Sequence, residues 1–188
     1  MTSMRQILQG GWIPFGMALT ASLTFCFLVY PHIAADQHAV LDPDGYGRLG
    51  FGLWKHGTLS YYPDTESTVA RGPAYPALIC MMLAATGGWW PGSVQTAQCV
   101  LFALVTWMIY RMGQMLAGKR AGFIAALVFA VYPMPIWFTS RIWVEILAMF
   151  LMTAFCLTLM QYLSSPRARI ALLAGLILGI ATLCKSTF

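Results

Sequence analysis

The chain consists largely of long apolar segments separated by shorter polar ones. Segments of about membrane-spanning length cover residues 11–30, 93–116, 121–138, 145–163 and 170–184. Because lipid cannot hydrogen-bond to the backbone, such segments cross a membrane as helices. The 188 residues are 59% hydrophobic and 9% charged, whereas soluble domains carry about 25% charged residues. We therefore expect a single all-α, polytopic membrane domain over residues 1–188 with about five transmembrane helices.

The cations indicate how this domain is oriented. If the short apolar segment 74–88 stays at the surface, one side of the membrane receives Arg5, Arg111, Lys119, Arg120, Arg167 and Arg169. If that segment spans, Arg5 is separated from the other five. Cytoplasmic loops carry an excess of Lys and Arg, which favours the first arrangement. We expect an integral protein of the bacterial inner (plasma) membrane, with a cytoplasmic N-terminus and an uncleaved signal anchor at 11–30.

The same arrangement puts residues 31–92 in a periplasmic (outer) loop that carries two juxtamembrane helices, near 44–56 and 73–88. In the first of these, apolar residues and a glycine recur at helical spacing, at Tyr46, Leu49, Gly50, Leu53 and Trp54. This pattern predicts a short amphipathic helix on the membrane surface. Asp42 or Asp44 precedes it, where a capping carboxylate belongs.

Two further patterns concern the later helices. Pro133 and Pro135 are expected to close the third spanning helix, because proline disrupts a helix interior. Gly175 and Gly179 form a small-xxx-small pattern in the last helix, which predicts close helix packing. The five cysteines lie in or beside apolar segments without metal-site spacing, so we interpret them as packing residues.

The acidic residues are unusually placed. Five of the six carboxylates belong to the outer loop, and the sixth, Glu145, begins a later helix at the same face. Acids are costly near lipid, so such placement indicates function. Arg71, Arg141 and Lys185 are expected at that face too. A carboxylate there can serve as a general base, and Arg or Lys can bind a phosphate. The basic residues form no run suited to nucleic acid, so none is expected as a partner.

Structural interpretations remain open for these charges. Asp42 and Asp44 could only cap the surface helix. Glu145 could pair with Arg141, four residues earlier, and Arg141 and Lys185 could extend their charges to the interface. Asp64 and Glu66 are expected to be solvated. A cluster of His32, Asp36 and His38 could bind a metal, but its spacing matches no metal-site template.

Three segments resemble a known family: DPDGYGRLGFGLWKHGTLSYYP, RGPAYPALICMMLAATG and AGKRAGFIAALVFAVYPMPIWFTSRIWVEIL. They resemble the N-terminal part of lipid-linked sugar transferases with the type C glycosyltransferase (GT-C) fold, namely the dolichyl-phosphate-mannose protein mannosyltransferase-like and aminoarabinose lipid A transferase-like proteins. The resemblance runs from about Leu41 to the C-terminus. It implies transfer of a sugar from a polyprenyl-phosphate donor to an acceptor at the outer membrane face, with membrane lipids as surroundings.

The resemblance also implies site residues. The family's catalytic loop acid matches Asp42, four residues before Tyr46, with Asp44 as the alternative. Its Ser-Glu element falls on Val144 and Glu145, so that Glu145 would position the catalytic loop or a substrate. A divalent metal ion held by Asp42 with Asp44 or Glu145 is compatible with this arrangement but not implied by it.

Substrate-binding residues follow in the same way. The family's Arg-Pro-Pro-Gly-Tyr-Pro element corresponds to residues 71–76, which puts Arg71 and Tyr75 in it. Its Thr-Arg-Pro-Thr element corresponds to residues 184–187, which include Lys185. The resemblance implies that Arg71 and Lys185 meet the donor phosphate.

The chain departs from the family at Val144, Gly72 and Lys185–Ser186, and members usually continue with further helices. We therefore expect either a fragment of a longer enzyme or a short homologue that has lost catalysis. The rival hypothesis is a non-catalytic subunit that packs in a larger membrane-protein complex. A small transporter is disfavoured, because Glu145 lies near a helix end rather than at mid-membrane.

Overall fold

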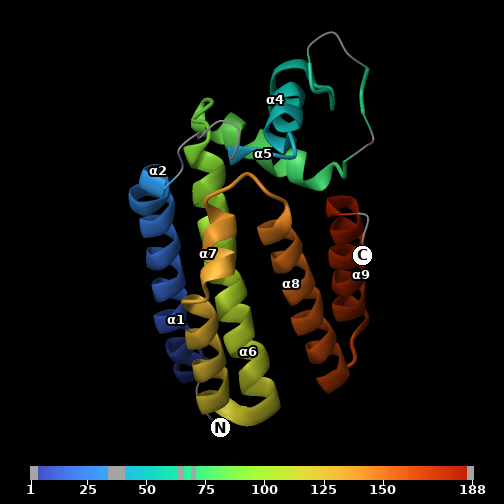
Figure 1. Ribbon diagram of the computed structural model, residues 1–188. Coiled ribbons are helices and arrows are strands. Elements are labelled where there is room, and N and C mark those ends of the chain that lie inside the picture. The colour runs from blue at the N-terminus through green and yellow to red at the C-terminus, as the bar shows by residue number, and fades with distance from the viewer. Residues whose placement is uncertain (1–3, 34–40, 63–65, 69–70, 186–188) are drawn as a thin grey trace.

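The structure of this chain is a computed structural model that describes residues 4–33, 41–62, 66–68 and 71–185, with side chains from Gly10 onward. Within these ranges the regular structure is entirely helical (Figure 1). A continuous first helix comprises α1 (Met4–Thr24), a π-helical turn η1 (Phe25–Val29) and α2 (Tyr30–Ile33). The others are α4 (Tyr46–His56), α5 (Ala74–Thr86), α6 (Gly92–Ala130), α7 (Pro133–Thr139), α8 (Glu145–Ser164) and α9 (Ala168–Cys184).

Several of these helices have the length and composition of membrane spans. Three stretches qualify on both counts, at Gly10–Ile33, Gly92–Ala130 and Glu145–Ser164, and two apolar helices are shorter, at Ala74–Thr86 and Ala168–Cys184. The long helices and α9 stand side by side as a bundle, with α1 packed on α6 and α8 packed on α9 (Figure 1). The expected all-α, polytopic membrane architecture is confirmed.

The helix α6 is two antiparallel segments joined by a sharp break. Ala117 (φ −138°) and Gly118 (φ 86°) leave helical geometry, and the chain reverses there (Figure 1). The two segments approach closely where glycines meet, since a Cβ on Gly113 would lie 2.7 Å from the Cα of Gly122. The predicted helices 93–116 and 121–138 therefore correspond to the first segment of α6 and to its second segment followed by α7.

The prediction that Pro133 and Pro135 close the third spanning helix holds only in part: the helix ends just before Pro133, but both prolines belong to a new helix, α7. The second segment of α6 ends at Ala130, and Pro133 is the first residue of α7. Tyr132, just before it, has extended geometry, with φ −70° and ψ 121°. Proline suits the first position of a helix, because its φ is already fixed near the helical value and its missing N–H is not needed there.

The prediction of close packing at Gly175 and Gly179 is also wrong for the described residues. A Cβ added at either glycine would meet nothing within 4 Å. The helix α9 instead buries Ala174, Ala181 and Cys184 against the bundle. The glycine pattern lies on a different face of α9, which the described part of the chain leaves uncovered.

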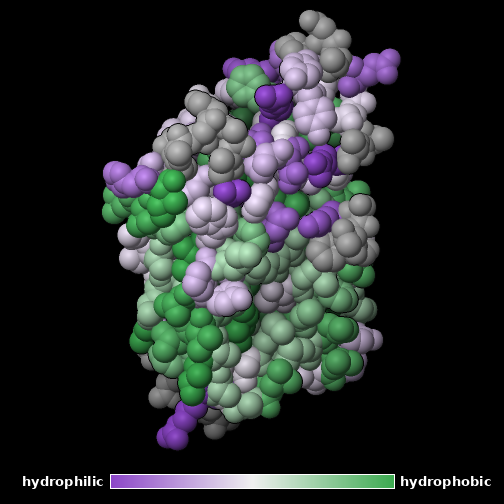
Figure 2. All heavy atoms as spheres, viewed as in Figure 1, coloured by the Kyte–Doolittle hydropathy of each residue, from purple (hydrophilic) through white to green (hydrophobic). Residues whose placement is uncertain are grey.

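The two ends of the bundle differ. At one end, here called the polar end, α4 and α5 lie across the start of α8 and the end of α9 (Figure 1). Hydrophilic residues gather there on the visible face, and hydrophobic ones cover most of the rest (Figure 2). A buried cluster that includes Tyr46, Tyr75 and Val144 ties α4 and α5 to α8. The opposite end, here called the turn end, carries the α6 break and the α8–α9 connection.

Candidate functional site

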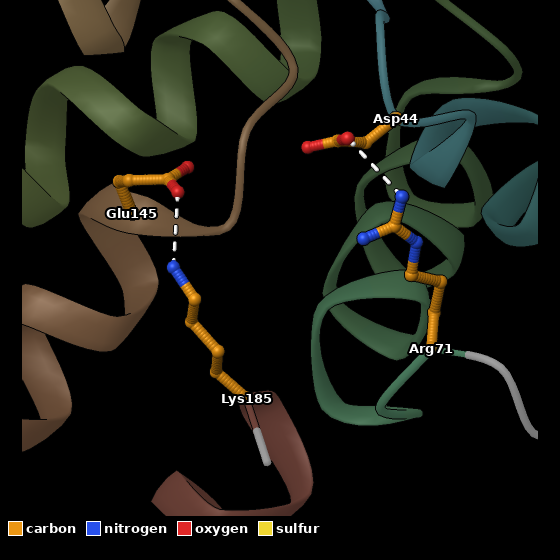
Figure 3. Close-up of polar contacts among 4 residues, drawn as sticks. All are labelled: Asp44, Arg71, Glu145 and Lys185. Atoms are coloured by element: carbon orange, nitrogen blue, oxygen red, sulfur yellow. Dashed lines mark hydrogen bonds and ion pairs between the residues drawn. The ribbon is translucent and has the colours of Figure 1, made fainter. Parts of the chain in front are cut away.

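Four of the predicted site residues form two ion pairs at the polar end (Figure 3). Asp44 Oδ1 lies 3.2 Å from Arg71 Nη2, and Glu145 Oε1 lies 3.3 Å from Lys185 Nζ. The four side chains come from four places in the chain: the segments before α4 and before α5, the first turn of α8, and the residue after α9. The fold thus brings together charges that are up to 141 residues apart in the sequence, from position 44 to position 185.

Tyr46, the first residue of α4, links the two pairs. The Arg71 guanidinium lies over the Tyr46 ring, 5.4 Å from its centroid. Burial raises the pKa of the Tyr46 hydroxyl; Arg71 lowers it, and the carboxylates of Asp44 and Glu145 raise it further. Because charges from both ion pairs act on one phenol, the two pairs belong to a single electrostatic environment.

A glycine allows Arg71 and Lys185 to approach each other. A Cβ at Gly72 would meet the carbonyl oxygen of Leu183 and lie 2.9 Å from that of Cys184. The chain next to Arg71 therefore packs directly on the end of α9, and Lys185 follows at once. The resemblance puts a proline of the family at position 72, and here any side chain would push these segments apart. Gly72 is thus a departure from the family pattern that this packing requires.

Buried amides hold the connection between α7 and α8 in place. Gln98 Nε2 donates hydrogen bonds to the carbonyl oxygens of Thr139 (3.1 Å) and Arg141 (2.6 Å). Gln95 Nε2 donates to the carbonyl oxygen of Ser140 at 2.7 Å. The Tyr75 hydroxyl donates to Gln98 Oε1 at 2.6 Å. These contacts fix the backbone that leads into Glu145.

Tyr75 has no exposed surface, so it supports the site from beneath in this structure, and substrate binding by Tyr75 stays a prediction. Sequence reasoning missed Gln95 and Gln98. Their signal was available, since two glutamines one helical turn apart in an apolar segment need partners when they are buried.

Asp42 occupies a separate part of the polar end. Its Oδ2 accepts a hydrogen bond from the backbone N–H of Gly47 at 2.9 Å. The preceding carbonyl of Leu41 accepts one from the N–H of Ile142 at 2.7 Å, which ties Asp42 to the α7–α8 connection. Asp42 Oδ1 is buried without a hydrogen-bond partner. Burial raises the pKa of Asp42, although the backbone amides of the first turn of α4 oppose that shift.

A cavity of about 480 Å³ opens beside Asp42. This volume lies within the range of small-molecule sites. A Cβ at Gly47 would lie 2.7 Å from Asp42 Oδ2 and would meet the Trp90 ring, so glycine is needed to keep the carboxylate beside the cavity. The lining combines this acid with basic, hydroxyl and aromatic groups: Leu41, Asp42, Gly47, Arg48, Phe51, Gly52, His56, Ser60, Tyr61, Tyr62 and Trp90. Sequence reasoning missed Arg48, His56 and Trp90.

The structure decides between the capping and ion-pairing interpretations of Asp42, Asp44 and Glu145. The N-cap of α4 is Gly45 rather than Asp42 or Asp44, but Asp42 accepts a hydrogen bond from the first turn of α4 through Gly47 and also lines the cavity. Asp44 pairs with Arg71 instead. The proposed Arg141–Glu145 pair is wrong, because Arg141 precedes α8 and its guanidinium lies between two indole rings, 4.7 Å from Trp137 and 4.9 Å from Trp143.

Metal binding gains no support from the described part of the chain, which brings together no group of three or more His, Cys, Asp or Glu side chains. Asp36 and His38 of the predicted His32 cluster lie outside the described residues, as does Asp64. A metal ion held by Asp42 with Asp44 or Glu145 would need further ligands.

The helices and the polar end define a polytopic membrane protein with acids and cations gathered at one end of its bundle. The profile of the dolichyl-phosphate-mannose-protein mannosyltransferase family matches residues 70–188, and the chain belongs to this family. The matched region includes Arg71, Tyr75, Glu145 and Lys185, whereas Asp42 and Asp44 precede it. Neither the curated proteins nor the solved structures contain a match to the chain.

Proposed function

We propose that this chain transfers a sugar from a polyprenyl-phosphate donor to a hydroxyl acceptor at the outer membrane face. Membership of a mannosyltransferase family supports the reaction class. The main support is Asp42: a half-buried carboxylate, whose Oδ1 is buried without a hydrogen-bond partner, at the edge of a cavity large enough for a small acceptor. Buried polar atoms usually have partners, and a substrate hydroxyl would supply the missing one.

In the proposed reaction Asp42 accepts the proton of the acceptor hydroxyl in the cavity. The acceptor oxygen attacks the anomeric carbon of the donor sugar from the face opposite the phosphate. The bond between that carbon and the phosphate oxygen breaks, and its electron pair leaves with the polyprenyl phosphate, so the configuration inverts. The raised pKa of Asp42 makes it a stronger base than an ordinary aspartate. Asp44 is the weaker candidate, since its charge is already paired with Arg71.

Arg71 and Lys185 would bind the donor phosphate. Their side chains are 40% and 43% exposed, so a phosphate can reach them while the ion pairs persist or exchange. Arg can contact two phosphate oxygens at once, and Lys acts as a point charge. Glu145 would orient Lys185 through their ion pair. The isoprenoid chain would remain among the membrane lipids beside the bundle.

We propose that the polar end faces the periplasm of a bacterial inner membrane. The turn end would then face the cytoplasm with Arg111, Lys119, Arg120, Arg167 and Arg169, as the positive-inside rule favours. A lipid-carried donor suits the outer face, because nucleotide sugars are cytoplasmic.

A transfer assay tests the proposal. Membranes that contain the full chain would receive a polyprenyl-phosphate sugar labelled in the sugar, and the label released from the lipid to acceptors would be followed with time. Asp42→Asn should lower the rate by about 10² to 10⁴-fold, as expected for loss of a general base. Asp44→Asn is the matched control and should keep most of the rate. Equal rates for the wild type and Asp42→Asn would refute the assignment.

One observation favours a second candidate, a non-catalytic subunit of a larger membrane complex. The Gly175–Gly179 face of α9 is uncovered, and Leu172 and Leu176 beside it are 76% and 61% exposed. Small residues allow a partner helix to approach closely in lipid. Mild solubilisation from the native membrane, followed by mass measurement, separates the candidates: a stable complex that keeps its mass in Asp42→Asn and loses it in Gly175→Leu supports the subunit.

A further inference from the structure

The turn end carries cations that form no ion pair with any carboxylate in the described part of the chain. None of the six carboxylates lies between residues 67 and 144 or after residue 145. Both ion pairs within the described residues are at the polar end. Within the described residues no carboxylate pairs with the cations of the turn end.

Two of these cations line a shallow groove of about 430 Å³ between α1 and α6, here called the Lys119–Arg120 groove. Its other lining residues are Gly10, Tyr110, Phe123 and Ile124. The Tyr110 ring is buried against Gly10, and Ile124 is 60% exposed. The groove thus joins a cationic rim to an apolar wall, as a ligand with a charged head and a hydrocarbon part requires.

The local backbone adds to the excess of positive charge. Lys119 and Arg120 open the second segment of α6, directly after the break at Ala117 and Gly118. The N-terminal turn of a helix carries partial positive charge, so two cations there are electrostatically unfavourable until an anion binds. One turn beyond Ile124, Val128 is 62% exposed. An acyl chain could run along these two side chains from the groove into the lipid.

We propose that the Lys119–Arg120 groove binds the headgroup of an anionic phospholipid. Basic pockets between membrane helices bind such headgroups, and each cation near the surface strengthens the attraction. The apolar wall selects a lipid over a free phosphate. This site lies at the end of the bundle opposite the proposed sugar-transfer site, and it does not depend on that function.

The test uses the full chain purified in detergent and placed in bilayer nanodiscs of phosphatidylcholine, with or without phosphatidylglycerol. Bound phosphatidylglycerol is counted by native mass spectrometry after release from the discs, and the thermal unfolding midpoint is recorded. The wild type should retain phosphatidylglycerol over phosphatidylcholine and unfold at a higher temperature when it is present. Equal retention of both lipids, or an equal rise in midpoint with inorganic phosphate alone, would overturn the proposal.

Matched variants separate the groove from general surface charge. The double variant Lys119→Gln with Arg120→Gln should retain at least about tenfold less phosphatidylglycerol. Arg167→Gln with Arg169→Gln removes the same charge outside the groove and should stay within about twofold of the wild type. Equal losses in the two double variants would contradict a defined site. Ile124→Trp keeps every charge but fills the groove, so it should lose phosphatidylglycerol while its midpoint in phosphatidylcholine stays unchanged; wild-type retention by this variant would count against the groove.

Discussion

The two ends of the bundle differ in whether their cations pair with carboxylates. At the polar end, Arg71 and Lys185 each have a carboxylate partner from a different part of the chain. At the turn end, Lys119 and Arg120 lie on the rim of a groove, in a part of the sequence that contains no acid. The polar end is also held by buried side-chain hydrogen bonds from Gln95 and Gln98. The turn end is formed mainly by a backbone reversal.

This difference suggests that the polar end is organised from within, whereas the turn end depends on its surroundings. A site that must position a donor and an acceptor needs fixed groups, and internal hydrogen bonds provide them. A surface that meets lipid headgroups needs only cations and an accessible groove. Matched substitutions at the two ends should therefore differ in their effects on stability.

The largest expected difference in the free energy of unfolding is between substitutions of two glutamines on α6. Gln98→Leu would leave the Tyr75 hydroxyl and two backbone carbonyls without their buried partner. It should lower the free energy of unfolding by about 2–3 kcal/mol, measured by denaturant titration in bicelles. Gln114→Leu, nearer the turn end on the same helix, should change it by less than about 0.5 kcal/mol. Equal effects would contradict the internal organisation of the polar end.

A smaller effect is expected from two glycines. Gly72→Ala would press a methyl group against the carbonyls at the end of α9, so it should destabilise the protein by about 1–3 kcal/mol and weaken transfer. Gly175→Ala faces open space within a helix and should stabilise it by about 0.5–1 kcal/mol. Thermal unfolding of the two variants in parallel checks the opposite signs. A neutral Gly72→Ala would show that the contact with α9 is not tight.

The smallest expected difference in stability is between Lys185, which has an ion-pair partner, and Lys119, for which the described residues supply none. Lys185→Gln leaves Glu145 without its partner and should cost less than about 1 kcal/mol, because both side chains are partly exposed. Lys119→Gln removes a cation from a helix N-terminus and should raise stability by about 0.3–0.5 kcal/mol in phosphatidylcholine. Salt should reduce both effects. If Lys185→Gln also raises the KM for the donor, whereas Lys119→Gln does not, the proposed role of Lys185 in phosphate binding is strengthened.

Much of the fold could be predicted from the sequence, because apolar length and charge placement are strong signals in a membrane protein. Segment lengths predicted the all-α membrane fold. The sequence does not show how tertiary packing decides the structural role of a proline or a glycine. Pro133 follows the end of α6 and also begins α7, and the sequence predicted only the first of these. Gly175 and Gly179 form a packing pattern, but the face on which they lie depends on how α9 sits against α8.

The site was only partly predictable. The expected convergence of Arg71, Glu145 and Lys185 rested on charge and resemblance, but which carboxylate each cation pairs with is a tertiary property. The i, i+4 spacing left a pair between Arg141 and Glu145 open, and the structure removes Arg141 from that helix. The cavity beside Asp42 could not be predicted, because its lining comes from the segments before and after α4, from α4 itself and from Trp90, which lies 28 residues after Tyr62.

The pH dependence of sugar transfer between about pH 4 and 8 tests whether Asp42 is the catalytic base. Catalysis requires ionised Asp42, and burial raises its pKa, so the rate should rise with pH through a midpoint above the ordinary aspartate value of about 3.9. Acid unfolding driven by protonation of Asp42 cannot explain the low transfer rate at low pH. A raised folded-state pKa stabilises the protein most at low pH, and this stabilisation is lost as pH rises. The same midpoint is expected in Asp44→Asn. A flat profile in the wild type, or a midpoint that disappears in Asp44→Asn, would contradict it.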